Sequence, residues 1–88
     1  MLPKSNRRSE KRVIGAGDIL LSFDDPLHCD FRADLVDLSQ NGFRAAYEYA
    51  PLSPGQLVAF ERANARGTAR VIWTRIIGAR TESGFLAI

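Results

Sequence analysis

The sequence predicts an all-β fold, a six-stranded antiparallel β-barrel preceded by a flexible basic arm. Short runs of β-forming residues recur along the chain of 88 residues, turn residues separate them, and no amphipathic helical period is present. A chain of this length forms one domain with a single modest core. The six expected strands are residues 18–23, 29–39, 42–50, 57–62, 68–75 and 84–88.

The first twelve residues differ from the rest of the chain in pattern and charge. Residues 1–12 have no apolar periodicity, carry five basic residues and one acidic residue, and are expected to form the arm. Residues 13–88, the expected barrel, carry seven basic and nine acidic residues, so the net charge of +2 conceals a basic arm on an acidic body. A protein that coats a nucleic acid polymer spreads positive charge over a face, so no such partner is expected. A concentrated arm suits a compact anion better, although a plain basic tail stays an open alternative.

Alternation of apolar and polar residues is clearest in the middle of the chain. In 42–50 it has a period of two, which predicts that Tyr47 and Tyr49 lie on a buried strand face. In the preceding run, residues 29–39, the alternation is regular at first. It is then interrupted in "LVDL", where Leu35 and Val36 are consecutive apolar residues. The Asn41-Gly42 pair between these runs suits a type I′ hairpin turn, because both residues tolerate positive φ. Other turns are expected at Asp24-Asp25-Pro26, "PLSPGQ" (51–56), "ANARG" (63–67) and "IIGARTES" (76–83).

Several classes of protein are not expected. No apolar run approaches the roughly 20 residues of a membrane span, and no apolar segment follows the basic N-terminus as in a secretory signal. Cys29 is the only cysteine, which excludes an internal disulfide and fits a cytoplasmic location. The adjacent residues His28, Cys29 and Asp30 point to alternate sides of a strand, so neither a metal site nor a catalytic triad is expected. We therefore expect no enzyme, no cofactor and no membrane partner.

Two arginines of the arm are candidate ligand-binding residues. Arg8 and Arg12 are four residues apart within "RRSEKR". A guanidinium donates paired hydrogen bonds to phosphate oxygens and to the O6/N7 edge of guanine. Taken alone, the pair is more typical of a solvated basic tail.

A second group of candidates surrounds the expected turn. Asp37 and Ser39 are two residues apart on a strand, so their side chains should leave the same face. A carboxylate accepts two hydrogen bonds from the N1–H and N2–H₂ edge of guanine, and a hydroxyl adds an adaptable partner. Gly42 has no Cβ to keep a ligand or another backbone away. Alternatively, Asp37 and Ser39 satisfy backbone groups beside a tight turn, and Arg44 is a strand residue that faces solvent.

Taken together, these residues resemble the PilZ domain, a family that pairs an RxxxR arm with a [D/N]xSxxG motif on a strand and turn. Arg8 and Arg12 fill the first motif, and Asp37, Ser39 and Gly42 fill the second about 25 residues later. The order of short strands, the "PLSPGQ" loop, the "ARVIW" strand and the "GF" near the end are also similar. The resemblance covers nearly the whole chain.

The resemblance implies a receptor for cyclic di-GMP, a bacterial second messenger, that catalyses no reaction. In the family, the two arginines of the arm close over the ligand and contact phosphates and guanine faces. The aspartate and serine hold a guanine edge, and the glycine leaves room. Arg44 occupies the position of an arginine that often joins the site, and Arg7 is a candidate for a clamp compatible with a stacked ligand dimer. Ordering of the arm on binding would then signal to a downstream partner protein.

The sequence departs from the family pattern at its end. PilZ domains usually continue into a C-terminal helix, which is apparently absent after Ile88. The barrel is therefore expected to be a minimal domain or to be covered by a partner or a second copy, which leaves a homodimer open.

Two rival functions also stay open. The first is a ligand-free adaptor that docks onto motility or secretion proteins. The second is a barrel that binds single-stranded nucleic acid, which requires exposed aromatic residues interleaved with basic ones. That pattern is limited to Phe43-Arg44 and to Trp73 with Arg70 and Arg75. Trp73 is expected to pack in the core or at the barrel edge, with stacking against a guanine as the alternative.

Overall fold

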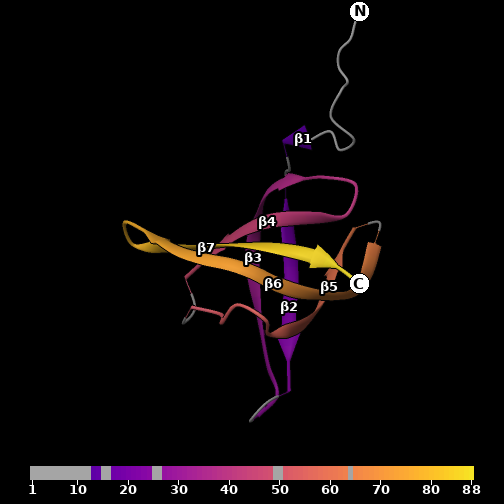
Figure 1. Cartoon of the computed structure of the whole chain (residues 1–88), viewed down its shortest axis with the longest axis horizontal. Coiled ribbons are helices and arrows are strands. Elements are labelled where there is room, and N and C mark those ends of the chain that lie inside the picture. The colour runs from indigo at the N-terminus through magenta and orange to yellow at the C-terminus, as the bar shows by residue number, and fades with distance from the viewer. Residues whose placement is uncertain (1–12, 15–16, 25–26, 49–50, 64) are drawn as a thin grey trace, which may run out of the picture.

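All described elements of the chain are β-strands, as the sequence predicts. The computed structural model describes residues 13–14, 17–24, 27–48, 51–63 and 65–88, so the predicted arm over 1–12 lies outside the described residues. No helix, and hence no membrane-spanning helix, occurs in these ranges. The strands are β1 (Val13–Ile14), β2 (Asp18–Phe23), β3 (Cys29–Leu38), β4 (Gly42–Tyr47), β5 (Leu57–Arg62), β6 (Ala65–Ile77) and β7 (Arg80–Ala87) (Figure 1).

Six of these strands form a closed antiparallel barrel. Around the barrel the order is β3, β2, β5, β6, β7 and β4, and the pairing of β4 with β3 closes the ring. In Figure 1, β2 and β3 run across the direction of β6 and β7, as expected for opposite sides of a barrel. All six predicted strands are therefore confirmed. The sequence did not predict the short strand β1, which pairs with the end of β3.

The boundaries of the last two strands differ most from the prediction, and β4 ends at Tyr47, before the predicted end at residue 50. β6 begins at Ala65 and β7 begins at Arg80, so parts of the expected connections "ANARG" and "IIGARTES" are strand. Only Gly78 and Ala79 form the turn between them, and Gly78 has a φ of +63°. A two-residue turn with positive φ suits the twist of a hairpin and allows pairing to continue almost to its tip.

Apolar side chains from all six barrel strands fill the interior. The ring of Phe43 stacks on that of Phe85 with centroids 4.7 Å apart, and it also contacts the ring of Phe60. Tyr47 is buried as predicted, whereas Tyr49 lies outside the described residues. The core consists of Ile19, Leu21, Ala33, Leu35, Phe43, Ala45, Tyr47, Leu52, Val58, Ala69, Val71 and Phe85.

A β-bulge near the end of β3 changes which side chains face outward. Leu35 pairs with Ala45 and Asp37 pairs with Arg44, so Val36 is an extra residue without a partner position on β4. Without the bulge, Asp37 would share the inward face of Leu35, two residues before it. The bulge places Asp37 beside Arg44 on the outside of the barrel.

A second bulge does the same in β6. Val71 pairs with Phe85 and Trp73 pairs with Gly84, which leaves Ile72 as the extra residue. Val71 is buried, whereas Trp73 lies on the outer side with Gly84. Both bulges therefore set outward-facing side chains in register on one part of the wall.

Candidate functional site

The two bulges align four residues across the outside of the barrel. Asp37 of β3 pairs with Arg44 of β4, Arg44 pairs with Gly84 of β7, and Gly84 pairs with Trp73 of β6. The row places a carboxylate, a guanidinium, a residue without a side chain and an indole on neighbouring strands. We refer to these four residues as the outer row.

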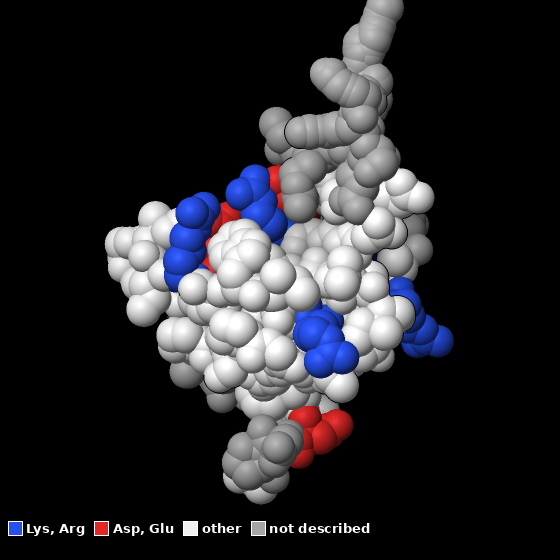
Figure 2. Space-filling view, viewed as in Figure 1, with Lys and Arg blue, Asp and Glu red and all other residues white. Residues whose placement is uncertain are grey.

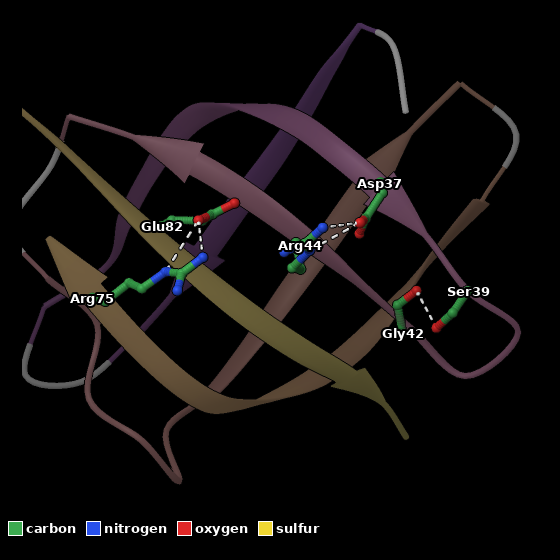
Figure 3. Close-up of polar contacts among 6 residues, drawn as sticks. All are labelled: Asp37, Ser39, Gly42, Arg44, Arg75 and Glu82. Carbon is green, nitrogen blue, oxygen red and sulfur yellow. Dashed lines mark hydrogen bonds and ion pairs between the residues drawn. The ribbon is translucent and has the colours of Figure 1, made fainter. Parts of the chain in front are cut away.

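Asp37 and Arg44 form an ion pair at one end of the outer row. Arg44 donates hydrogen bonds from Nε, at 2.9 Å, and from Nη2 to the same oxygen, Asp37 Oδ2 (Figure 3). The Asp37 side chain is 8% exposed and that of Arg44 is 33% exposed. The hydrogen bond to Asp37 raises the pKa of Arg44, and this effect outweighs the opposing effect of burial. The pair is thus neutral overall, with a partly exposed guanidinium held against a buried carboxylate.

Ser39 and Gly42 close the turn between β3 and β4. The backbone N–H of Ser39 donates to the carbonyl oxygen of Gly42 at 2.9 Å, and the Ser39 hydroxyl donates to the same oxygen at 3.3 Å (Figure 3). The turn is therefore centred on Gln40 and Asn41, and Gly42 is the first residue of β4. Ser39 satisfies the backbone beside a tight turn, which is the alternative that the sequence left open.

The prediction of a type I′ turn at Asn41-Gly42 is wrong, because Gly42 does not have positive φ. A glycine is required at this position for a different reason. A Cβ at this position would collide with the backbone carbonyl oxygen of Phe85 on β7. Gly42 lets β7 approach β4 closely, so the barrel itself requires this glycine.

A shallow depression of about 160 Å³ lies beside the outer row. It brings together three of the predicted site residues, Ser39, Gly42 and Arg44, whereas Asp37 adjoins it through its ion pair with Arg44. The depression is also lined by Trp73, Ile72 and Leu86. The sequence did not predict Ile72 and Leu86 as site residues.

Trp73 forms one wall of the depression and packs over Gly84. A Cβ on Gly84 would collide with the indole ring, so the missing side chain makes room for it. The guanidinium of Arg75 lies 5.2 Å from the ring centroid, and its Nη2 is 3.2 Å from Glu82 Oε1 (Figure 3). Trp73 therefore packs on the barrel surface, supported by its neighbours, and not in the core.

The remaining predicted site residues belong to the arm. Arg7, Arg8 and Arg12 lie outside the described residues. Strand β1 follows Arg12 directly in the sequence, and its residues Val13 and Ile14 pair with Leu38 and Asp37. The chain that follows the arm is thus anchored beside the Asp37 end of the outer row.

A different polar cluster lies at the β2–β3 hairpin. His28 Nδ1 is 2.6 Å from Asp24 Oδ1, and His28 Nε2 is 3.5 Å from Asp30 Oδ2. These hydrogen bonds raise the pKa of His28, with Asp24 the larger cause. Nowhere in the described ranges do three His, Cys, Asp or Glu residues form a group that could hold a metal ion.

Comparison of the chain with models of protein families finds no match, and comparison with curated proteins finds no similar sequence.

Proposed function

We propose that this protein is a receptor for cyclic di-GMP, with the depression beside the outer row as the rigid half of its site. One observation carries the proposal: Trp73 of β6 lines a single depression together with Ser39 and Arg44 of the β3–β4 hairpin, which lies far from it in the sequence. These groups offer a hydroxyl, a guanidinium and an aromatic face, which together suit a purine base and its phosphate.

The size of the depression favours a single base of the ligand. At about 160 Å³ it is smaller than the roughly 300–1,000 Å³ of pockets that enclose a whole drug-sized molecule. One guanine would stack against the indole of Trp73 and take the place of the Arg75 guanidinium, which lies over the ring in the free protein. The rest of the dinucleotide would stay outside the depression, within reach of another segment of the protein.

Arg44 and Asp37 would exchange partners on binding. A guanidinium donates to phosphate oxygens or to guanine O6 and N7, and a carboxylate accepts from guanine N1–H and N2–H₂. Arg44 would turn from Asp37 toward the ligand, while the Asp37 carboxylate accepts from the guanine edge. The ion pair thus holds both groups ready beside the depression and is itself a competitor of the ligand.

The basic arm would supply the second half of the site. Arg7, Arg8 and Arg12 carry the charge needed to close over two phosphates, and the chain joins the barrel beside Asp37 through β1. Ordering of the arm over the ligand would change the surface available to a downstream protein.

The test is isothermal titration of cyclic di-GMP into the full chain. We expect saturable binding that Arg8→Ala and Arg12→Ala each weaken by at least about tenfold, because each removes a charge-assisted contact. Arg66→Ala is the matched control, since Arg66 lies on β6 outside the depression and its loss should leave binding unchanged. Trp73 is the only tryptophan, so its fluorescence reports directly on ligand stacking.

A flat titration with folded protein would contradict the proposal. A single-stranded oligonucleotide serves as a second ligand, because Trp73 with Arg70 and Arg75 also matches the pattern of single-strand binding. Binding of the oligonucleotide with higher affinity than cyclic di-GMP would favour that function instead.

The Asp37–Arg44 ion pair favours a second candidate, a ligand-free adaptor. Both charges are satisfied within the protein, so the motif residues have a structural role that needs no nucleotide. In that case Arg44→Ala would lower the free energy of unfolding, and cyclic di-GMP would not raise the unfolding temperature of the unaltered chain.

A further inference from the structure

A second surface lies next to the depression, on the outside of β5, β6 and β7. Across one register row Leu86 pairs with Arg70, which pairs with Leu57. In the next row the N–H of Ile88 donates to the carbonyl oxygen of Thr68, which pairs with Ala59. The β5–β7 face is defined by these six residues: Leu57, Ala59, Thr68, Arg70, Leu86 and Ile88.

The β5–β7 face exposes several aliphatic side chains. Leu57, Leu86 and Ile88 are 49%, 46% and 70% exposed, and Ile72 beside them is 48% exposed. Single exposed aliphatic side chains are common, whereas several gathered on one face favour an interaction site. Figure 2, viewed as Figure 1, shows that charged side chains are sparse on this side of the molecule, where separate blue side chains lie among uncharged residues.

Arg70 is the only charged residue of the β5–β7 face. Its Nη1 donates to the carbonyl oxygen of Gly55 at 3.3 Å, and the ion pairs within the described part of the chain do not include it. One row further along, Glu61 pairs in register with Arg66, so opposite charges stand together there. The β5–β7 face thus offers one positive charge among aliphatic side chains.

We infer that the β5–β7 face docks a segment of a partner protein that carries a carboxylate among apolar side chains. A carboxylate would form a paired hydrogen bond with the guanidinium of Arg70. Leu57 and Leu86, on either side of Arg70, would contact apolar side chains of the segment and exclude water from this ion pair. Charge complementarity therefore selects an acidic segment.

Charge also argues against two other occupants. An interface between two copies of this chain is self-complementary, so a two-fold axis through the face would bring Arg70 close to its own copy. The arm over 1–12 carries five basic residues and one acidic residue, so it does not complement Arg70 either. Of the six residues of the face, Leu86 is the one that also lines the depression, so docking on Leu57, Arg70 and Ile88 does not require nucleotide binding.

The test is selection of binders to the full chain, without nucleotide, from a random peptide library displayed on phage. We expect enriched peptides to carry Asp or Glu among Leu, Ile, Val or Phe. The same selection on Arg70→Glu should enrich peptides with Lys or Arg at that place. Binding of a synthetic acidic peptide should weaken by about tenfold or more in Arg70→Glu and in Leu57→Ser. Arg66→Glu, the matched control, should keep the preference and affinity of the unaltered chain.

Three results would overturn the inference. The first is enrichment of peptides without a preference for acidic residues. The second is an acidic peptide whose affinity is the same for Leu57→Ser, Arg70→Glu and the unaltered chain, since it then binds elsewhere. The third is a dimer in sedimentation equilibrium that dissociates in Leu57→Ser, which would identify a second copy as the occupant. Urea unfolding of each variant establishes that it is folded before its affinity is compared.

Discussion

Strand β4 alternates without interruption, whereas β3 and β6 each contain one extra residue. In β4, Phe43, Ala45 and Tyr47 are buried, while Arg44 between them is on the outside. The bulges of β3 and β6 reverse the expected direction of the residues that follow them and align the outer row. The regular strand alternates between the core and the outer surface along its whole length, whereas the bulges bring residues of β3 and β6 into register with Arg44 in the candidate site. The comparison predicts large effects on stability from the core and smaller, more specific ones from the site.

The largest expected effect is at the regular strand. Phe43 is 4% exposed and contacts the rings of Phe85 and Phe60, so Phe43→Ala should lower the free energy of unfolding by roughly 3–5 kcal/mol. Urea unfolding followed by circular dichroism measures this loss. The control is Leu27→Ala, because Leu27 is 76% exposed and its truncation should change stability by less than about 0.5 kcal/mol. Equal losses for the two variants would mean that the alternation of β4 does not form the core.

The next largest effect is expected for the ion pair of the outer row. Asp37→Ala removes the carboxylate that accepts both hydrogen bonds of Arg44, and Arg44→Ala removes a hydrogen-bonded cation from a buried carboxylate. Breaking a buried pair costs roughly 3–5 kcal/mol, and we expect about 3 kcal/mol here, because Arg44 is one-third exposed. The double variant Asp37→Ala/Arg44→Ala should lose less than the sum of the single variants. A double-mutant cycle of unfolding free energies measures the coupling, and strict additivity would contradict the pairing.

A substitution of Gly42 tests whether this glycine is needed for packing of the barrel or for ligand binding. Gly42→Ala should lower the free energy of unfolding by about 1–3 kcal/mol, because its Cβ would collide with the Phe85 carbonyl of β7. Gly67→Ala is the matched control, since a Cβ there would only reach ordinary contact with the Phe60 ring at 3.5 Å. If Gly42→Ala keeps full stability but loses ligand affinity, the glycine serves the ligand and not the barrel.

The fold follows from the sequence because its evidence is local. Period-two alternation and turn residues identify all six barrel strands, and the burial of Tyr47 follows from the same pattern. The candidate site is harder to predict, because a bulge depends on pairing between distant strands. The consecutive apolar residues in "LVDL" and "RVIW" are its only sequence signals, at Val36 and Ile72. Two long-range contacts are not encoded in any local pattern: β7 approaches Gly42 closely, and Trp73 packs on Gly84.

The smallest effect is expected at the β2–β3 hairpin, where His28 is the exposed counterpart of the Asp37–Arg44 pair. Hydrogen bonds to Asp24 and Asp30 raise the pKa of His28 above its ordinary value of 6.5, so the folded state binds the proton more tightly than the unfolded state. The resulting stabilisation is complete below about pH 6.5 and is lost as the pH rises through the raised pKa. Because these three side chains are 57–83% exposed, solvent screens the interaction and the loss should be slight.

Urea midpoints measured from about pH 5 to about pH 8 test this expectation, with His28→Asn as the control that cannot titrate. The midpoint of the unaltered chain should fall slightly relative to the variant as the pH rises. A loss of unfolding free energy as large as the coupling free energy between Asp37 and Arg44 would mean that solvent exposure does not weaken the interactions of His28. A rise would contradict the direction of the pKa shift itself.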